Sequence, residues 1–272
     1  MQQINSLRKC PVCHSGDHWI RYCTGPFYIV TCRACSLTFN ANPPDEGGLY
    51  ERYYEVLPEE SSRYDAHAPM ESVRELFHIN SWRCRAVRSL KTKGSVLDIG
   101  CGPGYFLKTI SESGFAVRGV EISKAAAEFG RERFGLDICQ GTMEDCMATG
   151  GKFDVITLWH VLEHFPDPVD VLRKVRALLA TDGIALVEVP NLHSLKFMLS
   201  REKWSGGNDP LYHRSFFCAK TLQQCLQEAG FKKTRRLRLS YPVPGRGKAL
   251  LAIKRTLNFI NLDSFLAYAA YG

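Results

Sequence analysis

A chain of 272 residues with a formal charge of +7 is long enough for one α/β domain and a small accessory module. Its composition, 45% hydrophobic and 23% charged, excludes a disordered chain, and no apolar run reaches the roughly 18 residues that a membrane span needs. Because no segment has the order of a secretory signal, we expect a cytoplasmic protein whose eleven cysteines bind metal or remain buried thiols.

Two Cys-x-x-Cys pairs near the N-terminus have the spacing of a zinc ribbon. The four cysteines are Cys10, Cys13, Cys32 and Cys35. Each pair places two sulfurs on one tight turn, and two such turns present four thiolates to Zn²⁺ in a tetrahedron. Because four protein ligands leave no position for water, we expect a structural zinc ion in a ribbon of residues 1–40, with strands at 19–22 and 27–30. Whether the ribbon caps a substrate cleft or recruits a partner stays open.

Residues 41–94 are predicted to link the ribbon to a second domain. Proline, glycine and acidic residues between 40 and 60 indicate an irregular connection. Apolar side chains then recur at helical spacing from about 69 to 90, and Gly94 ends that helix. The remaining residues, 95–272, are expected to form one α/β domain.

A buried strand then runs through a glycine turn into a helix. Gly100, Gly102 and Gly104 allow a sharp bend and a close approach of a ligand, whose polar groups can meet the N–H groups at the helix start. The dinucleotide fingerprint needs its third glycine where Tyr105 stands, so the spacing disfavours a nicotinamide cofactor. Asp98 would repel a pyrophosphate but suits a cofactor that carries an ammonium and a sulfonium.

Further acidic residues follow the next two predicted strands. Glu121 ends the first of them, where its carboxylate can accept both ribose hydroxyls; the alternative is an acid that only faces a helix start. After a strand at 136–140, Met143 is expected to pack on the adenine, and Glu144 or Asp145 to accept a hydrogen bond from its amino group.

Together these signals resemble class I S-adenosylmethionine-dependent methyltransferases. They are the motif at 98–104, Glu121, the Glu144–Asp145 loop and residues 153–168, in the family's order. The resemblance implies S-adenosylmethionine as cofactor and a doubly wound α/β fold with a seven-stranded, mostly parallel, Rossmann-like sheet. Its last, antiparallel strand is expected at 264–270. The ribbon and residues 204–231 resemble a subgroup associated with the methylation of sugars, glycans and secondary metabolites.

The acceptor is expected at the carboxyl ends of the strands. His160 directly follows an apolar strand, so we expect it to line the cofactor and acceptor site, although a packing histidine is the alternative. Quinone O-methyltransferases carry an acid-x-x-Glu-His metal cluster here, and His160 stands where their first acid would be. A catalytic divalent metal at His160, Glu163 and His164 therefore stays open.

Residues 191–217 resemble the subgroup's lid segment, whose histidine lies near the acceptor. That resemblance makes His213 the first candidate for a general base, with His160 as the second. A related subgroup of sugar C-methyltransferases carries a His-Glu-His cluster at this point. The Tyr212-His213-Arg214 sequence lacks it, which favours transfer to oxygen or nitrogen.

The predicted function is therefore methyl transfer from S-adenosylmethionine to an oxygen or nitrogen of a small molecule, such as a sugar, a glycan precursor or a related metabolite. One alternative is an RNA base methyltransferase that contacts RNA through the ribbon, and another is a noncatalytic adaptor. Basic residues are scattered except for a run at 232–238, which fits a solvated strand edge and disfavours nucleic acid as the partner. A tail helix at 248–259 is compatible with peripheral membrane contact, and the oligomeric state cannot be predicted.

Overall fold

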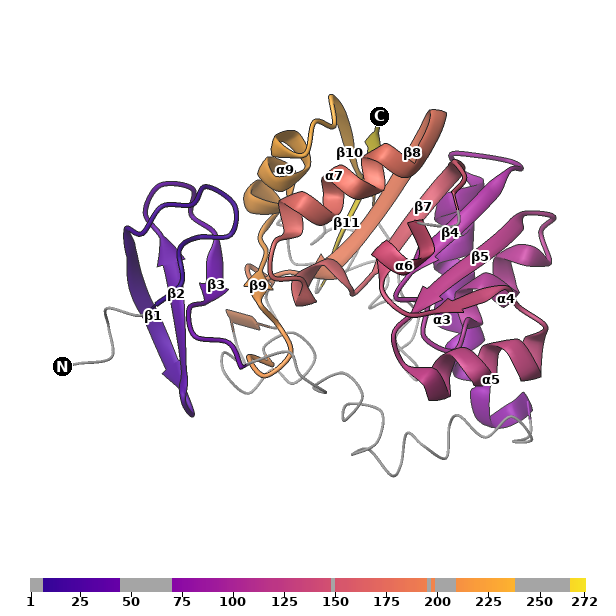
Figure 1. Ribbon diagram of the computed structural model, residues 1–272, viewed down its shortest axis with the longest axis horizontal. Coiled ribbons are helices and arrows are strands. Elements are labelled where there is room, and N and C mark those ends of the chain that lie inside the picture. Colours follow the sequence, from indigo (N-terminus) through magenta and orange to yellow (C-terminus); the bar gives the residue numbers. More distant parts are fainter. Residues whose placement is uncertain (1–6, 45–69, 148–149, 195–196, 199–208, 238–264) are drawn as a thin grey trace, which may run out of the picture.

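The computed structural model describes most of the chain in two sheets that lie side by side (Figure 1). The described residues are 7–44, 70–147, 150–194, 197–198, 209–237 and 265–272. The predicted tail helix at 248–259 and the middle of the predicted lid, 195–196 and 199–208, lie outside them. Among the helices in the described ranges, none is both long and apolar enough to cross a bilayer.

The larger sheet has seven strands in the order β10-β11-β8-β7-β4-β5-β6. Its strands are β4 (Ser95–Ile99), β5 (Ala116–Glu121), β6 (Ile138–Gln140), β7 (Phe153–Trp159), β8 (Leu179–Pro190), β10 (Lys233–Leu237) and β11 (Phe265–Tyr271). The five strands from β8 to β6 run parallel, whereas β11 is antiparallel to both of its neighbours. The predicted fold class and the inserted last strand are thereby confirmed.

Helices cover both faces of this sheet, because its central strands are apolar on both sides. The helices are α3 (Met70–Arg88), α4 (Tyr105–Ser111), α5 (Lys124–Phe134), α6 (Met143–Met147), α7 (Pro168–Leu178) and α9 (Ala219–Glu228). Val155 packs in the core beneath α3 and α4, whereas its neighbour Ile156 packs with α7 and α9. Ser123 caps α5 by accepting from Ala126 N–H at 3.3 Å, as its position before the helix predicts.

The smaller sheet has four strands in the order β1-β2-β3-β9. They are β1 (His18–Thr24), β2 (Phe27–Cys32), β3 (Thr38–Asn40) and β9 (Ser215–Phe216). The first two are the predicted ribbon strands. The pairing of β3 with β9 was not predicted, and it joins the ribbon to a segment more than 170 residues later in the chain. The predicted domain boundaries themselves remain a prediction.

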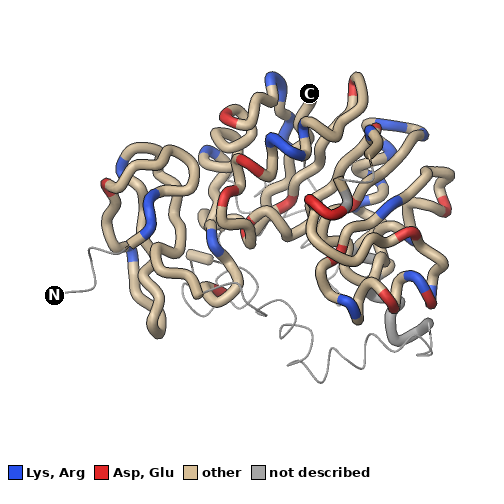
Figure 2. The backbone as a smooth tube through the Cα atoms, in the orientation of Figure 1, with Lys and Arg blue, Asp and Glu red and all other residues tan. Residues whose placement is uncertain are grey.

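Basic and acidic residues are interspersed along the described backbone (Figure 2). The predicted basic run begins on β10, which is an edge strand of the seven-stranded sheet. Lysine and arginine on such an edge discourage pairing with another chain. This position agrees with the predicted role of the run as a solvated strand edge.

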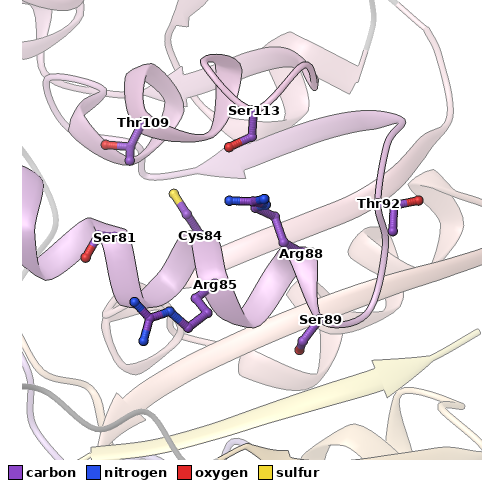
Figure 3. A pocket seen from close by; sticks show the side chains of 8 residues that line it. All are labelled: Ser81, Cys84, Arg85, Arg88, Ser89, Thr92, Thr109 and Ser113. Atoms are coloured by element: carbon purple, nitrogen blue, oxygen red, sulfur yellow. The ribbon is translucent and has the colours of Figure 1, made fainter.

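A polar cavity of about 590 Å³ lies between α3 and α4 (Figure 3). Arg88 projects from α3 toward Ser113, and Cys84 lies beside it. Thr92 and Ser113 immediately precede β4 and β5, so the cavity lies at the amino ends of the parallel strands. Ligands of open α/β sheets bind at the opposite, carboxyl edge, and this cavity is therefore not the cofactor site.

Gly130 allows α5 to pack closely on the glycine turn after β4. A Cβ at this position would lie 2.9 Å from the backbone oxygen of Pro103 and 2.4 Å from Ile138 Cδ1. Gly130→Ala should therefore lower the free energy of unfolding by about 1–3 kcal/mol, although alanine favours a helix. Gly16→Ala is the control, because no atom lies within 4 Å of its Cβ. Urea unfolding measures both variants, and a Gly130→Ala protein as stable as the wild type would contradict this packing.

Candidate functional site

The candidate site lies where the winding of the sheet reverses direction. Strands added after β4 lie on one side of it, as β5 and β6, and then on the other, as β7 and β8. In open α/β sheets the ligand crevice opens at the carboxyl ends of the strands on either side of such a switch point. The glycine turn follows β4 and His160 follows β7, so the structure brings these two predicted site regions together.

The glycine turn has a backbone that side chains other than glycine rarely adopt. The φ angles are +66° at Gly100, +54° at Gly102 and +81° at Gly104. A Cβ at Gly100 would lie 2.6 Å from Val161 Cγ2, and one at Gly104 would lie 2.4 Å from Leu136 Cδ1. A Cβ at Gly102 meets no atom within 4 Å. Gly100 and Gly104 are thus required by packing, whereas Gly102 leaves open space for a ligand.

Glu121 holds the glycine turn in place from the end of β5. Its Oε2 accepts from Gly102 N–H and its Oε1 accepts from Ser123 N–H, each at 2.8 Å. Burial raises the pKa of this carboxyl, while those backbone N–H groups favour its ionised form. Each carboxylate oxygen keeps a second lone pair, so the predicted contact with ribose hydroxyls is compatible with this bracing role.

Asp98 lies buried at the end of β4 and is stabilised by Thr157, a residue that the sequence did not single out. Asp98 Oδ1 accepts from the Thr157 hydroxyl at 2.6 Å. Burial raises the pKa of Asp98 to about 7; the hydrogen bond and Arg83 oppose that rise, and Glu121 adds to it. A positively charged ligand nearby would favour the ionised form, in keeping with the predicted sulfonium cofactor.

The residues predicted to contact adenine follow β6 and already have partners. Asp145 Oδ2 accepts from Thr142 N–H at 2.8 Å and Asp145 N–H donates to Thr142 Oγ1 at 3.3 Å, which starts α6. Glu144 Oε1 lies 2.6 Å from Lys174 Nζ, and this contact lowers the pKa of Glu144. The side chain of Met143 is buried in the core. Their contact with adenine stays a prediction.

His160 lies between two buried carboxylates. Its Nδ1 is 3.5 Å from Glu163 Oε1 and its Nε2 is 3.8 Å from Glu188 Oε2. Glu188 also accepts from Arg83 Nε at 3.0 Å, a contact between β8 and α3 that the sequence did not reveal. The His160 backbone has a φ of +61°, and its N–H donates to Glu188 O at 2.9 Å. The edge of its ring contacts Phe265, with 4.5 Å between the centroids.

Glu163, His164 and His213 form a second cluster next to His160. One potential ligand atom from each lies within 4.8 Å of the others, and the two imidazole centroids are 4.8 Å apart. Glu163 is 1% exposed, and neither of its carboxylate oxygens accepts a hydrogen bond from a described residue. His164 Nδ1 lies 3.2 Å from Tyr212 O, and Arg214 N–H donates to Glu163 O at 2.8 Å.

This cluster keeps Glu163 negatively charged. Burial alone would raise the pKa of its carboxyl, but His160, His164 and His213 outweigh burial and hold that pKa below its usual value. One carboxylate and two imidazoles are also a donor set that transition metals bind. The set differs from the trio considered from the sequence, because His213 takes the place of His160. The Glu-His pair after β7 was the available signal, but it did not reveal the contact with His213.

The four ribbon cysteines converge as predicted. Cys10 Sγ is 3.4 Å from Cys35 Sγ, Cys13 Sγ is 3.4 Å from Cys32 Sγ, and all four sulfurs lie within 4.8 Å of one another. Zn–S bonds of about 2.3 Å in a tetrahedron require sulfurs at such separations. The Cys35 thiol lowers the pKa of Cys10 to about 5 against the effect of burial. These residues fit a structural Zn²⁺ ion, which would cross-link the two turns.

A family model described as a methyltransferase domain matches residues 71–235, more than half of the chain. The chain belongs to this family. The predicted resemblance to class I S-adenosylmethionine-dependent methyltransferases, and with it the predicted enzyme class and cofactor, is confirmed. The ribbon precedes the matched residues, so the zinc site rests on the geometry of its cysteines.

Curated relatives carry the name ubiquinone biosynthesis O-methyltransferase. The protein of Haemophilus ducreyi is 30% identical over 165 residues, which cover 54% of this chain and 70% of the relative. That of Actinobacillus pleuropneumoniae is 32% identical over 114 residues, which cover 38% of this chain and 49% of the relative. The chain thus spans about half the length of most of the first curated relatives that it matches.

Solved methyltransferase structures share the fold at low identity. An S-adenosylmethionine-dependent methyltransferase of Thermotoga maritima, described as a possible histamine N-methyltransferase, has a TM-score of 0.53 at 21% identity, over 82% of this chain and 98% of that one. The plantazolicin methyltransferase BpumL, in complex with a monoazolic desmethylPZN analogue and SAH, has a TM-score of 0.55 at 17% identity, over 82% of this chain and 93% of that one. At these identities the likeness shows the fold alone.

Gly102 provides a test of the cofactor cradle of this methyltransferase-family chain. Gly102→Ala should weaken S-adenosylhomocysteine binding by a factor of about ten or more, because the added methyl group fills the open space above the turn. Gly114→Ala is the matched control: it also has a positive φ, +85°, and open space at its Cβ, but it follows α4 at the amino edge of the sheet. Isothermal calorimetry compares S-adenosylhomocysteine binding by the two variants. Equal affinities would contradict the role of Gly102 in the cofactor cradle.

Asp98 provides a test through the pH dependence of stability. Because folding raises its pKa from 3.8 to about 7, the folded state binds more protons than the unfolded state between these values, and stability falls as pH rises through that window. The full effect is about 4 kcal/mol. Asp98→Asn should remove this part of the slope in urea unfolding measured from pH 4 to 8. Parallel stability curves for the two proteins would show that Asp98 titrates normally.

Proposed function

We propose that this chain transfers a methyl group from S-adenosylmethionine to a hydroxyl oxygen of a small molecule, with His213 as the general base. The observation that carries the proposal is the Glu163, His164 and His213 cluster at the carboxyl edge of the sheet. Val161, two residues before Glu163, contacts the glycine turn. The proposed base therefore belongs to a cluster whose loop packs on the cofactor cradle.

S-adenosylmethionine, when bound, supplies an electrophilic methyl group for an in-line displacement. Gly102 allows the cofactor to approach the backbone closely, and Glu121 fixes the turn and faces the ribose. Asp98, which is buried at the end of β4, supplies negative charge near the cationic cofactor. The remaining task is to position the acceptor and to remove its proton. His213 takes that proton, and the ionised Glu163 stabilises the resulting imidazolium.

His160 suits a positioning role better than the role of base. Each of its ring nitrogens faces a carboxylate, Glu163 on one side and Glu188 on the other. A ring whose two nitrogens both face carboxylates presents neither nitrogen to an acceptor hydroxyl. We therefore assign proton removal to His213 and assign to His160 the placement of Glu163.

The acceptor hydroxyl is proposed to belong to a phenolic ring or a sugar. The names of the curated relatives favour O-methylation, and the resemblance of the ribbon and lid to a sugar-modifying subgroup favours a saccharide. Methyl transfer to a catechol and to a nucleotide sugar, followed with labelled S-adenosylmethionine, separates the two classes. We propose a cytoplasmic setting, because a zinc site of four cysteines needs thiolates, which a reducing compartment maintains.

His213→Ala should reduce turnover by a factor of about 10² to 10⁴ and leave S-adenosylhomocysteine affinity unchanged, because the base acts on the acceptor alone. Gln227→Ala is the control, an exposed side chain on α9. Labelled methyl transfer and calorimetry give the two values.

Three results would change the proposal. Full turnover in the His213→Ala variant would remove this residue from the chemistry. A second metal ion per chain that this variant loses would indicate metal-assisted deprotonation at the same cluster. A wild-type protein without affinity for S-adenosylhomocysteine would favour a noncatalytic adaptor.

A further inference from the structure

The ribbon and the segment that carries His213 are held together by a sheet and a set of buried hydrogen bonds. We propose that the zinc ribbon positions His213 for catalysis, and that Asn40 and Arg8 are the positioning residues that connect the zinc site to the acceptor site. This inference rests on the proposed function, because it assumes that His213 acts on the acceptor.

The first connection is a backbone pairing. Strand β3 begins three residues after Cys35, and its Thr38 and Phe39 pair antiparallel with Phe216 and Ser215 of β9. All residues of β3 are buried. Ribbon side chains such as Phe39 belong to the same apolar core as Leu222 of α9. The ribbon is therefore built into the core beside the acceptor site, and it is not a separate appendage.

Asn40 fixes the backbone on both sides of His213. Its side-chain Nδ2 donates to Pro210 O at 2.8 Å, and its backbone N–H donates to Arg214 O at 3.1 Å. Asn40 is completely buried, so the loss of a partner would leave one of its own polar groups unpaired away from water, which is costly. The histidine lies between the two anchored carbonyl groups.

Arg8 ties the same backbone to the first zinc turn. Its Nε donates to Asn40 O and its NH2 group donates to Arg214 O, each at 2.8 Å. Arg8 N–H also donates to Ala41 O at 2.9 Å. Because Arg8 stands two residues before Cys10, the cross-link between the two cysteine pairs fixes the position from which this guanidinium reaches Arg214.

The opposite side of the segment is attached to the catalytic cluster. Arg214 N–H donates to Glu163 O, and Tyr212 O lies 3.2 Å from His164 Nδ1. The segment with His213 is thus held between the ribbon and the Glu163-His164 loop. If the ribbon moves, the segment keeps only its contacts with the Glu163-His164 loop. His213 can then move away from the Glu163 carboxylate.

Zinc controls this support. A ribbon of about 35 residues buries too little surface to fold by itself, so its shape depends on the metal. Cys32 ends β2 and Cys35 lies in the turn before β3, and Cys32 N–H donates to Leu37 O across this turn at 2.8 Å. Removal of zinc should therefore loosen β3 and, through it, residues 209–217, while the cofactor cradle after β4 stays intact.

Two substitutions with matched controls test the connection. Asn40→Ala removes the bond to Pro210, whereas Asn42→Ala removes an amide that bonds only to Tyr28 N–H and Pro26 O among the described residues. Arg8→Ala removes the bond to Arg214 O in the 209–217 segment and the bond to Asn40 O. Its control is Arg33→Ala, an exposed ribbon arginine paired with Asp17.

Hydrogen exchange followed by mass spectrometry reads out the segment without an acceptor. In Asn40→Ala and Arg8→Ala, amide exchange in residues 209–217 should rise about tenfold, with exchange in β4 and β5 unchanged. Zinc chelation of the full-length wild type should give the same pattern, and added zinc should reverse it. Unchanged exchange in 209–217 after zinc loss, verified by metal analysis, would overturn the proposal.

Kinetics then separate positioning from general destabilisation. The two variants should lose turnover by a factor of about 10 to 100, with the KM for S-adenosylmethionine and the affinity for S-adenosylhomocysteine within about twofold of the wild type. The Asn42→Ala and Arg33→Ala controls should retain turnover. If exchange in residues 209–217 rises as expected but the His213→Ala protein is fully active, the ribbon is coupled to this segment and the proposal that His213 is the base is wrong. Full turnover in the two variants alongside an inactive His213→Ala protein contradicts the positioning role.

Discussion

The buried carboxylate of Glu163 is the constraint on which the proposed acceptor site depends. It is almost inaccessible to water, and no described residue donates a hydrogen bond to either of its oxygens. A buried charge without compensation is strongly unfavourable. Three histidines lie around it and hold its pKa low: His160 beside it, His164 next in sequence and His213 from a distant segment. The same ionised carboxylate can stabilise the imidazolium that forms when a histidine takes a proton from the acceptor, and this shared charge connects stability with chemistry.

Three parts of the chain meet at this carboxylate. The loop after β7 carries Glu163 itself, the segment before β9 brings His213, and the ribbon strand β3 supports that segment from outside. On the cofactor side, Glu121 performs a comparable task, since it braces the glycine turn through Gly102 N–H. Each half of the site therefore has one buried acid that orders the backbone or side chains around it.

The cofactor half of the site could be predicted from the sequence because its signals are local. A strand, three glycines and an acid at the end of the next strand specify one turn and its partner, and the observed φ angles at Gly100, Gly102 and Gly104 agree with that reading. The zinc site was predictable for the same reason, because each Cys-x-x-Cys pair is a local turn. The seven-stranded, mostly parallel sheet and its antiparallel last strand followed from the family resemblance and are confirmed.

The acceptor half could be predicted only in part, because its contacts join residues far apart in the chain. His213 was chosen by resemblance, but its contact with Glu163 depends on how the 209–217 segment packs. The pairing of β3 with β9 and the ion pair of Arg83 with Glu188 left no periodic or spacing signal. Such pairings are decided by tertiary packing, which a short sequence pattern does not encode.

A double-mutant cycle on methyl transfer tests most directly whether Glu163 acts through His213. Turnover is measured for Glu163→Gln, for His213→Ala and for the protein with both changes, with S-adenosylhomocysteine affinity confirming that each folds. If the carboxylate serves the histidine, the double variant should be about as slow as the slower single variant, because the two losses share one interaction. Losses that multiply fully would show that the two residues act independently and would contradict the central role of Glu163.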